Sequence, residues 1–236
     1  MTPRTSSGLT RAAVAHAALQ RLDAEGLDAL SMRRLAGELG VGTMTLYGYF
    51  RSKEELLDAV VDAGFSEFEM PPAGDDFRTT LRDFALAARA VLVRHPALVE
   101  IRDAGPILRP RGFQVTELGV RILSEAGLGA EDAARSFRLL FDYVFGYAIV
   151  NRRPPSPELR REALASIVAL PPEEFPTVTA VAEQMAEAVG AEGQFEYGLE
   201  RILDGIEARL AASRAGRRAR PGAPGARRRG TGPRPR

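Results

Sequence analysis

The sequence predicts an all-α protein, with a helix-turn-helix unit near its N-terminus and a larger helical domain after it. Apolar residues recur every three or four positions through most of the 236 residues, which is the spacing of an amphipathic helix. No stretch of useful length alternates apolar and polar residues, as a half-buried strand would. Within residues 31–50, two short helical patterns meet at Gly40-Val41-Gly42, the arrangement of a helix-turn-helix.

The first three helices are predicted from their capping residues. Thr10 is a suitable N-cap for the first helix, and Gly26 is a suitable stop for it. Ser31 caps a second, short helix that ends at Gly40, and a third helix covers residues 43–49. Five apolar residues are expected to pack in the core of this unit: Leu35, Leu39, Val41, Leu46 and Phe50.

A fourth helix is expected to begin at a capping box. The residues Ser52-Lys53-Glu54-Glu55 have the required pattern. In such a box the Ser52 hydroxyl accepts a hydrogen bond from the Glu55 N–H, and the Glu55 carboxylate reaches back to the Ser52 N–H. Further on, Pro71-Pro72-Ala73-Gly74 breaks the helical pattern, so a connector is expected there.

The connector separates a first domain, residues 1–66, from a second domain, residues 67–212, which is also expected to be helical. Its helices are expected from Phe77 to His95, from Pro96, over 112–126 up to Gly127, over 131–151, from Ser156, over 177–189 and over 194–212. Residues 104–111 contain two prolines and a glycine, so they are expected to form a loop.

The helix expected over 131–151 is apolar almost all round. A helix with so little polar face is buried on more than one side, and a second copy of the chain would supply the second cover. On the last helix, Gly198 and Gly205 lie seven residues apart and would let another helix approach closely. Both features favour a homodimer.

Composition excludes several classes of site. The chain has no cysteine and two histidines, His16 and His95, so it has no thiolate ligand and no basis for a histidine-rich metal site. No nucleophile–base pair, paired-carboxylate motif or phosphate-binding glycine loop is visible, so no catalytic residue, metal or cofactor is expected. Because no apolar run approaches the ~18 residues that span a bilayer and no signal peptide is visible, a cytoplasmic location without membrane contact is expected.

The net charge of +1 is unevenly distributed. Residues 214–236 hold nine arginines and no acidic residue, so the first 213 residues carry a net charge of −8. The segment 213–236 is also rich in glycine and proline, and it is expected to be disordered. This tail either adds non-specific, salt-sensitive affinity for DNA or serves only as a solubilising end.

Four short motifs stand at fixed spacing in the first domain. They are Leu30-Ser31-Met32-Arg33-Arg34-Leu35-Ala36, Leu39-Gly40-Val41, Thr45-Leu46-Tyr47 with Phe50, and Lys53-Glu54-Glu55-Leu56-Leu57. Together they resemble the DNA-binding domain of the tetracycline-repressor (TetR-type) regulators. The second domain resembles the regulatory domain of that family more loosely, through His95-Pro96-Ala97-Leu98, Phe141-Asp142-Tyr143-Val144-Phe145-Gly146-Tyr147 and Gln194-Phe195-Glu196-Tyr197-Gly198-Leu199.

The resemblance implies a ligand-responsive transcriptional regulator, in particular a repressor, that acts as an all-helical homodimer. Its two helix-turn-helix units would bind the halves of a palindromic operator in double-stranded DNA. Its second domain would bind a small-molecule inducer and would dimerise. The helices at about 131–151 and 194–212 would form the dimer interface.

The helix-turn-helix geometry and the resemblance together nominate side chains for DNA contact. Threonine hydroxyls and methyl groups can touch base edges, glycines let the backbone approach, and a lysine at a helix N-terminus can bind a phosphate. The candidates are Ser31, Met32, Arg33, Gly42, Thr43, Met44, Thr45, Tyr47, Gly48, Tyr49 and Lys53. For Tyr47 and Tyr49 the alternative is core packing, and for Lys53 it is a solvated surface charge.

Six residues of the second domain are candidates for the ligand pocket: Phe84, His95, Arg102, Phe113, Phe137 and Phe141. For most of them the alternative is ordinary core packing, and for His95 it is a hydrogen bond to backbone at a helix end. In the tetracycline repressors, histidines help to hold a drug–magnesium chelate. The loop at 104–111 has no histidine, so tetracycline is not expected to be the ligand.

Two other functions stay open at this point. A non-sequence-specific, architectural DNA-binding protein would use the arginine-rich tail and show no preference for a palindrome. A helical enzyme with an incidental helix-turn-helix is the second alternative, and no catalytic constellation in the sequence favours it.

Overall fold

The computed structural model describes residues 9–69, 76–103, 110–151, 156–189, 191 and 193–218. These residues form twelve α-helices, one short 3₁₀ helix and no strand, which confirms the all-α prediction. The elements are α1 (Arg11–Glu25), η1 (Leu27–Ala29), α2 (Met32–Glu38), α3 (Thr43–Tyr49), α4 (Lys53–Phe65), α5 (Phe77–Arg94), α6 (Pro96–Asp103), α7 (Pro110–Glu125), α8 (Ala130–Val150), α9 (Pro157–Val168), α10 (Pro176–Ala180), α11 (Ala182–Ala188) and α12 (Gln194–Arg218). None of these helices is long and apolar enough to cross a membrane.

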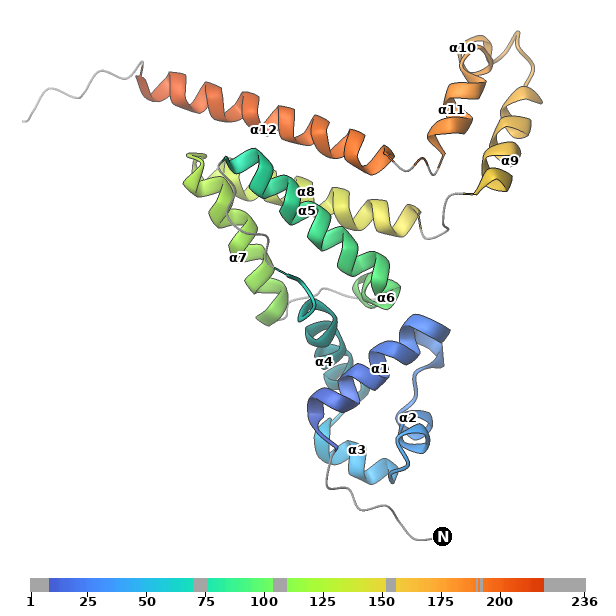
Figure 1. The fold of residues 1–236 in the computed structure, drawn as a ribbon, viewed down its shortest axis with the longest axis vertical. Coiled ribbons are helices and arrows are strands. Elements are labelled where there is room, and N and C mark those ends of the chain that lie inside the picture. Colours follow the sequence, from blue (N-terminus) through green and yellow to red (C-terminus); the bar gives the residue numbers. More distant parts are fainter. Residues whose placement is uncertain are drawn as a thin grey trace, which may run out of the picture.

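The helices gather into three parts (Figure 1). Helices α1–α4 with η1 form an N-terminal unit at one end of the molecule. Helices α5–α8 and α12 form a helical body, and α9–α11 stand away from that body as an arm. Helix α3 lies at the end of the N-terminal unit that is remote from the body.

The helices of the N-terminal unit begin and end at the predicted residues. The Thr10 hydroxyl accepts a hydrogen bond from the Ala13 N–H (3.1 Å), and the Ser31 hydroxyl accepts one from the Arg34 N–H (3.2 Å). Each bond satisfies a backbone donor that the first helical turn leaves unpaired. Gly26 and Gly40 have φ values of +80° and +67°, which glycine adopts without a steric penalty.

The core of the N-terminal unit forms between α1, α2 and α4, with a small contribution from α3. Leu35, Leu46 and Phe50 are fully buried, and the predicted Leu39 and Val41 pack against them half-buried. Burying each such side chain contributes about 1.5–3 kcal/mol. In helix α3 only Leu46 is buried and Thr43 and Tyr49 are half-buried, so Met44, Thr45, Tyr47 and Gly48 are the residues open to solvent.

The capping box at the start of α4 differs from the prediction in one bond. The Ser52 hydroxyl accepts from the Glu55 N–H (3.2 Å) as expected, but the Glu55 carboxylate accepts from the N–H of Arg51 (2.7 Å). The other oxygen of Glu55 pairs with Arg11 of α1 (2.9 Å). The Arg51 N–H, followed by Arg11, holds the pKa of Glu55 below its usual range. Glu55 therefore links α4 to α1 as well as capping α4.

Two helix boundaries of the second domain differ from the prediction. Helix α7 begins at Pro110, two residues earlier than expected, because proline fits the first turn of a helix. The single run expected over 177–189 is two helices, α10 and α11, since the backbone at Val181 (φ −115°, ψ +22°) leaves the helical region.

The last helix is longer than predicted. Helix α12 continues to Arg218, so the first six residues of the segment expected to be disordered, 213–236, are helical. Tertiary contact explains the extension, because the Arg214 guanidinium donates to the Ala126 carbonyl (3.2 Å) at the end of α7. The rest of that segment, the connector at 71–74 and most of the loop at 104–111 lie outside the described residues.

Two glycines let the helices of the body approach closely. A Cβ at Gly119 of α7 would lie 2.4 Å from the ring of Phe137, and one at Gly198 of α12 would lie 2.2 Å from the Tyr143 hydroxyl oxygen. The helix that approaches Gly198 is thus α8 of the same chain. A Cβ at Gly205 would meet no atom within 4 Å, so its neighbourhood is open in the single chain.

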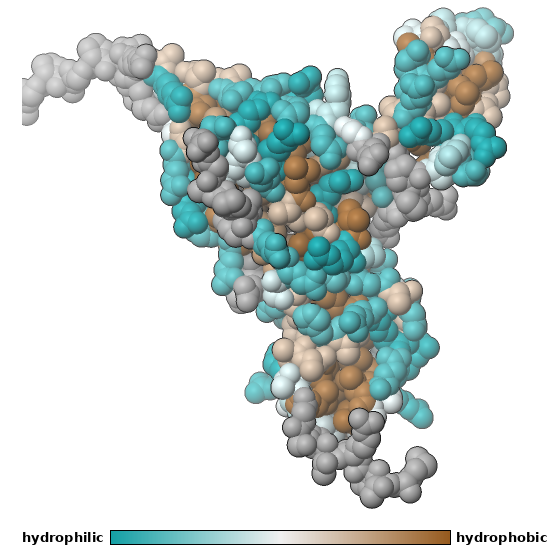
Figure 2. Space-filling model, in the orientation of Figure 1, coloured by the Kyte–Doolittle hydropathy of each residue, from teal (hydrophilic) through white to brown (hydrophobic). Residues whose placement is uncertain are grey.

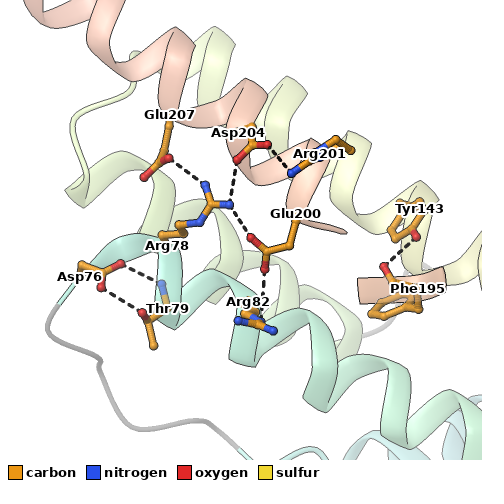
Figure 3. A network of polar contacts seen from close by, with 10 residues as sticks. All are labelled: Asp76, Arg78, Thr79, Arg82, Tyr143, Phe195, Glu200, Arg201, Asp204 and Glu207. Carbon is orange, nitrogen blue, oxygen red and sulfur yellow. Dashed lines mark hydrogen bonds and ion pairs between the residues drawn. The ribbon is translucent and has the colours of Figure 1, made fainter. Parts of the chain in front are cut away.

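A guanidinium clamp joins α5 to α12 (Figure 3). Arg78 of α5 lies among three carboxylates of α12: it contacts Glu200, pairs with Asp204 at 2.9 Å and pairs with Glu207 at 2.7 Å. Arg82 reaches Glu200 as well, at 3.3 Å. These hydrogen bonds raise the pKa of Arg78 and lower that of Asp204. Because the groups are partly exposed, the clamp fixes the register of α12 more than it adds stability.

The arm is the least buried part of the described chain. Only Ala182 and Ala186 are buried in it, whereas Val168, Phe175 and Met185 are exposed. Figure 2 shows apolar surface on this arm, which projects from the rest of the molecule. Helix α9 and helix α11 therefore support one another more than the body supports them.

We expect Gly198→Ala to destabilise the protein by about 1–3 kcal/mol, because the new methyl group would overlap the Tyr143 hydroxyl. That hydroxyl donates to the Phe195 carbonyl (2.9 Å), and its ring stacks on Phe195, so it cannot move aside freely. Urea unfolding measures the loss. Gly37→Ala is the control, since a Cβ there meets no atom within 4 Å and alanine favours a helix by about 1 kcal/mol. A Gly198→Ala variant as stable as Gly37→Ala would contradict this packing.

Candidate functional sites

Helix α3 has an exposed face whose side chains do not pack in the core of the protein. Met44 is 80 % exposed and Tyr47 is 43 % exposed. Thr45 and Gly48 are also exposed, while Thr43 is half-buried. Single exposed apolar side chains are common on protein surfaces, so this face is distinguished by its combination of apolar, hydroxyl and phenol groups and not by Met44 alone. This face carries the hydroxyl and methyl groups of Thr43 and Thr45, the methyl group of Met44 and the phenol of Tyr47. Such groups can contact base edges and phosphates when a helix lies in a major groove.

Cationic groups flank this face. Arg33 of α2 is exposed, and Lys53 at the N-terminus of α4 is half-buried. Gly42, exposed before α3, brings the backbone of the turn to the same surface. Ser31 is half-buried, and its hydroxyl oxygen is occupied by capping α2. The first turn of α4 offers both an ammonium group and backbone N–H groups to an anion.

Two predicted DNA contacts are better explained by packing. Met32 is only 7 % exposed because it belongs to the apolar core, so its side chain is unavailable to DNA. Tyr49 is half-buried, and its hydroxyl donates to the Leu9 carbonyl (2.7 Å). A phosphate accepts but does not donate, so contact with Tyr49 would require breaking that bond. The core alternative therefore fits Tyr49, whereas the exposed Tyr47 keeps its hydroxyl at the surface.

Sequence reasoning missed Arg51, which is exposed between α3 and α4. Its backbone N–H donates to Glu55 (2.7 Å), which fixes its backbone two residues after the end of α3. The sequence position of Arg51 could have identified it, because this cation lies two residues after the third helix and two residues before Lys53 of the capping box. Arg51 joins Arg33 and Lys53 as a candidate phosphate ligand.

A second candidate site is an apolar cavity inside the helical body, with a volume of about 700 Å³ when its open mouth is included. Among the described residues the side chains around it are apolar except that of Thr116, which carries a hydroxyl. They are Phe65, Phe84, Ala88, Leu92, Phe113, Val115, Thr116, Phe137, Leu140, Phe141, Val144 and Phe145. Four of the six predicted pocket residues lie here: Phe84, Phe113, Phe137 and Phe141.

Aromatic rings form a continuous wall of this cavity. The ring centroids of Phe84 and Phe137 are 6.5 Å apart, those of Phe137 and Phe141 are 6.1 Å apart, and those of Phe141 and Phe145 are 4.4 Å apart. Gly119 gives Phe137 the room for this position. Aromatic faces at such spacings favour flat, apolar ligands.

The two remaining pocket candidates lie elsewhere. The Arg102 guanidinium carbon is 4.5 Å from the ring centroid of Phe141 and 4.7 Å from that of Phe145, so it stacks on the wall rather than lining the cavity. His95 is away from the cavity, between the carboxylates of Asp23 (2.7 Å) and Glu67 (3.1 Å). The alternative for His95, a hydrogen bond to backbone at a helix end, differs from the contact in the structure, where Nδ1 bonds to the carboxylate of Asp23 on α1.

Acidic and histidine side chains do not gather into a metal site in the part of the chain that the structure describes. No group of three or more such side chains there has the geometry to hold a metal ion. The cavity and the α3 face differ in chemical character, since the cavity is lined by apolar side chains and the α3 face is mixed and exposed.

Comparison with known proteins matches both parts of the chain to one family. Residues 14–60 match "Bacterial regulatory proteins, tetR family", and residues 70–210 match "Tetracyclin repressor-like, C-terminal domain". The repressor DrrR1 of Streptomyces coeruleorubidus is 34 % identical over 220 residues, which cover 87 % of this chain and 80 % of DrrR1. The class D tetracycline repressor of Escherichia coli is 28 % identical over 212 residues, which cover 86 % of this chain and 92 % of that protein.

A solved structure resembles the whole fold. It is the ActR protein of Streptomyces coelicolor in complex with actinorhodin, which is 33 % identical to this chain with a TM-score of 0.75. The match covers 85 % of this chain and 97 % of ActR.

Met32→Ala and Met44→Ala should separate the core from the exposed face. We expect Met32→Ala to cost about 2–5 kcal/mol of unfolding free energy, because it leaves a cavity in the core. Met44→Ala should change that free energy by less than about 0.5 kcal/mol, because the side chain is exposed. Urea unfolding of both variants measures the difference. Equal losses would contradict the assignment of Met32 to the core.

Proposed function

Because the chain belongs to the tetR family of bacterial regulatory proteins, we propose that it is a homodimeric repressor that binds a palindromic operator and is released by a small-molecule effector. The observation that carries this proposal is the open face of α3, which buries only Leu46 and lies at the remote end of the N-terminal unit. Such a protein acts in the cytoplasm, where an operator is accessible.

The residues at the start of α3 would recognise the bases. Thr43, Met44 and Thr45 stand where the recognition helix of a helix-turn-helix meets base edges. Residues 1–66 carry seven basic and eight acidic side chains, so bulk charge does not draw this domain to DNA. The phosphate contacts depend instead on Arg33, Lys53 and Arg51 at the rim, aided by the Tyr47 hydroxyl.

A second copy would cover exposed faces of α8 and α12. On α8, Leu139 is 53 % and Val150 is 82 % exposed, and a Cβ at Gly146 would meet no atom within 4 Å. On α12, the exposed Gly205 and Ala208 lie on the side opposite the buried stripe. Small side chains of this kind let two helix pairs pack closely. Homodimers are typical of the family, and each copy would place one α3 against a half-site about 34–36 Å from the other.

The effector would occupy the aromatic cavity. Its wall of phenylalanine rings and Thr116, the one polar side chain among the described lining residues, fit a flat and largely apolar molecule. ActR, which shares this fold, has been solved with actinorhodin bound. The absence of histidine from residues 104–111 still argues against a metal-chelated tetracycline.

Two alternatives receive less support. An architectural DNA-binding role would rest on the arginine-rich tail, whose described part, up to Arg218, is helical and docks on the body through Arg214. An enzymatic role has no catalytic constellation, and the family is one of transcriptional regulators.

The decisive test is selection of bound sequences from random double-stranded DNA, followed by a screen of flat aromatic compounds for release of the selected DNA. We expect a palindromic consensus. Loss of all preference in competition with random DNA would favour the architectural alternative instead.

On the selected operator, we expect Tyr47→Ala to weaken binding about 10- to 100-fold, since a direct contact of this kind is worth about 1–3 kcal/mol in each complex. Unfolding by urea should be almost unchanged, because Tyr47 is exposed. Fluorescence anisotropy measures the affinity, and Phe175→Ala, an exposed aromatic on the arm, is the matched control. If Tyr47→Ala bound the operator as tightly as the wild type, the assignment of the α3 face to DNA binding would be wrong.

Ala208→Arg should convert the dimer to a monomer, because two copies would bring like charges together at a closely packed interface. Light scattering after size exclusion measures the mass. Operator affinity should fall by at least about tenfold, since one half-site then binds without the other. Ala90→Arg, on an exposed position of α5, should stay dimeric. A dimeric Ala208→Arg variant would place the interface elsewhere.

A further inference from the structure

Arg11 of α1 contacts both the end of α3 and the first turn of α4. Its guanidinium donates to the carbonyl of Tyr49, the last residue of α3, and pairs with a Glu55 oxygen of α4 at 2.9 Å. The guanidinium carbon also lies 4.3 Å from the ring centroid of Phe50, the C-cap of α3. These contacts form the Arg11 bridge, which joins α1 to the end of α3 and to the start of α4.

The end of α3, and not α1, stabilises the charge of Arg11. Arg11 is the first residue of α1, where the helix dipole favours acidic over basic groups. At the C-terminus of α3 the preference is reversed, because the last carbonyls of a helix lack intrahelical donors and interact favourably with a cation. The contacts across the N-terminal unit therefore explain an arginine at this position.

Glu55 extends the Arg11 bridge to the segment between α3 and α4. One Glu55 oxygen pairs with Arg11, and the other accepts from the Arg51 N–H (2.7 Å). The Glu55 N–H in turn donates to the Ser52 hydroxyl (3.2 Å). The carboxylate that binds Arg11 thus also holds the backbone of Arg51, a candidate phosphate ligand.

The end of α3 has a second tie to the segment before α1. The Tyr49 hydroxyl donates to the Leu9 carbonyl (2.7 Å), so Tyr49 is bound through both its backbone and its side chain. The start of α3 has no side-chain cap, because its N-cap is Gly42. Among the seven residues of α3, only Leu46 is buried. The direction of this short helix therefore depends on the contacts at its C-terminal end as well as on Leu46.

We propose that Arg11 is a positioning residue of the DNA-binding face: it fixes the end of α3 against α1 and α4, and so directs the start of α3 toward the bases. The proposal rests on the operator binding proposed above. Because the Arg11 side chain is 49 % exposed, direct contact with a DNA phosphate is the competing role. A phosphate contact strengthens binding to any duplex, whereas a correctly directed α3 strengthens binding only where the bases match.

Arg11→Met tests the proposal, because it removes the donors and keeps an apolar side chain beside the Phe50 ring. Anisotropy of the full chain measures affinity for the selected operator and for a random duplex of equal length at the same salt concentration. We expect operator affinity to fall at least about fivefold, because both copies of a dimer lose these hydrogen bonds. Affinity for the random duplex should change by less than about twofold.

The matched control is Arg161→Met on α9, which removes an exposed arginine that pairs with Glu158 (2.6 Å). It should leave both affinities unchanged. The proposal would be overturned if Arg11→Met weakened binding to the two duplexes equally, or if Arg161→Met weakened operator binding as much as Arg11→Met does.

Glu55→Gln distinguishes the two roles of Arg11 by the sign of its effect. The amide has one acceptor oxygen for Arg11 and Arg51 and turns its NH₂ group toward the other donor, so one bond is lost. Positioning predicts an operator affinity about two- to fivefold lower, and a double variant with Arg11→Met that loses less than the sum of the two single losses in free energy. A phosphate contact predicts no loss, because the variant frees Arg11 and removes a negative charge. Unchanged or higher affinity, or additive losses, would overturn the proposal.

Hydrogen exchange of the free protein tests the Arg11 bridge without DNA. The Phe50 N–H donates to the Leu46 carbonyl (2.9 Å), and this bond opens more often if the end of α3 is released. We expect Arg11→Met to speed exchange of the peptide covering residues 43–50 at least about threefold, and to leave exchange of α8 unchanged. Unchanged exchange of residues 43–50 would overturn the bridge even if operator binding is real. Faster exchange with no operator selected would support the bridge and count against the DNA-binding function alone.

Discussion

The arrangement of the molecule depends on the joint between α1 and α6. Asp23 of α1 is only partly exposed, and it holds both the backbone of Ala97 and the ring of His95. Across this joint, the position of the N-terminal unit is set relative to the helical body. In a dimer, the separation of the two α3 helices would follow from the dimer face, the body and this joint together, because close-packed parts transmit displacements instead of absorbing them.

The helical body is built so that a cavity can exist inside it. Gly119 and Gly198 bring α7 and α12 close to α8, while Arg78 and its three carboxylates fix α12 on α5 from outside. The rings of Phe137, Phe141 and Phe145 then line the space that remains between the helices. Helix α6 touches both regions, since Arg102 stacks on the cavity wall and Ala97 sits in the joint. The N-terminal unit therefore meets the cavity region in two ways, directly through Phe65 of α4, which lines the cavity, and indirectly through α6.

In the N-terminal unit, the positions of individual charged side chains matter more than the net charge. The first 66 residues carry nearly equal numbers of basic and acidic side chains, and several of the acidic ones are engaged internally: Glu55 with Arg11 and Asp23 with His95. Such pairing leaves Arg33, Arg51 and Lys53 as cations at the rim of the α3 face. A dimer would double this small set, which suits binding that relies on two half-sites rather than on one strongly basic surface.

The sequence alone determined the features that depend on neighbouring residues. The caps at Thr10, Ser31 and Ser52 and the ends at Gly26 and Gly40 act within one helical turn, so the starts of α1, α2 and α4 and the ends of α1 and α2 could be predicted from the sequence. The roles of Tyr49 and His95 could not. Their partners, Leu9 and Asp23, lie 40 and 72 positions away, and only tertiary packing brings such groups within hydrogen-bonding distance. The same reason explains the extra length of α12, because Arg214 finds its acceptor on α7, 88 positions earlier in the chain.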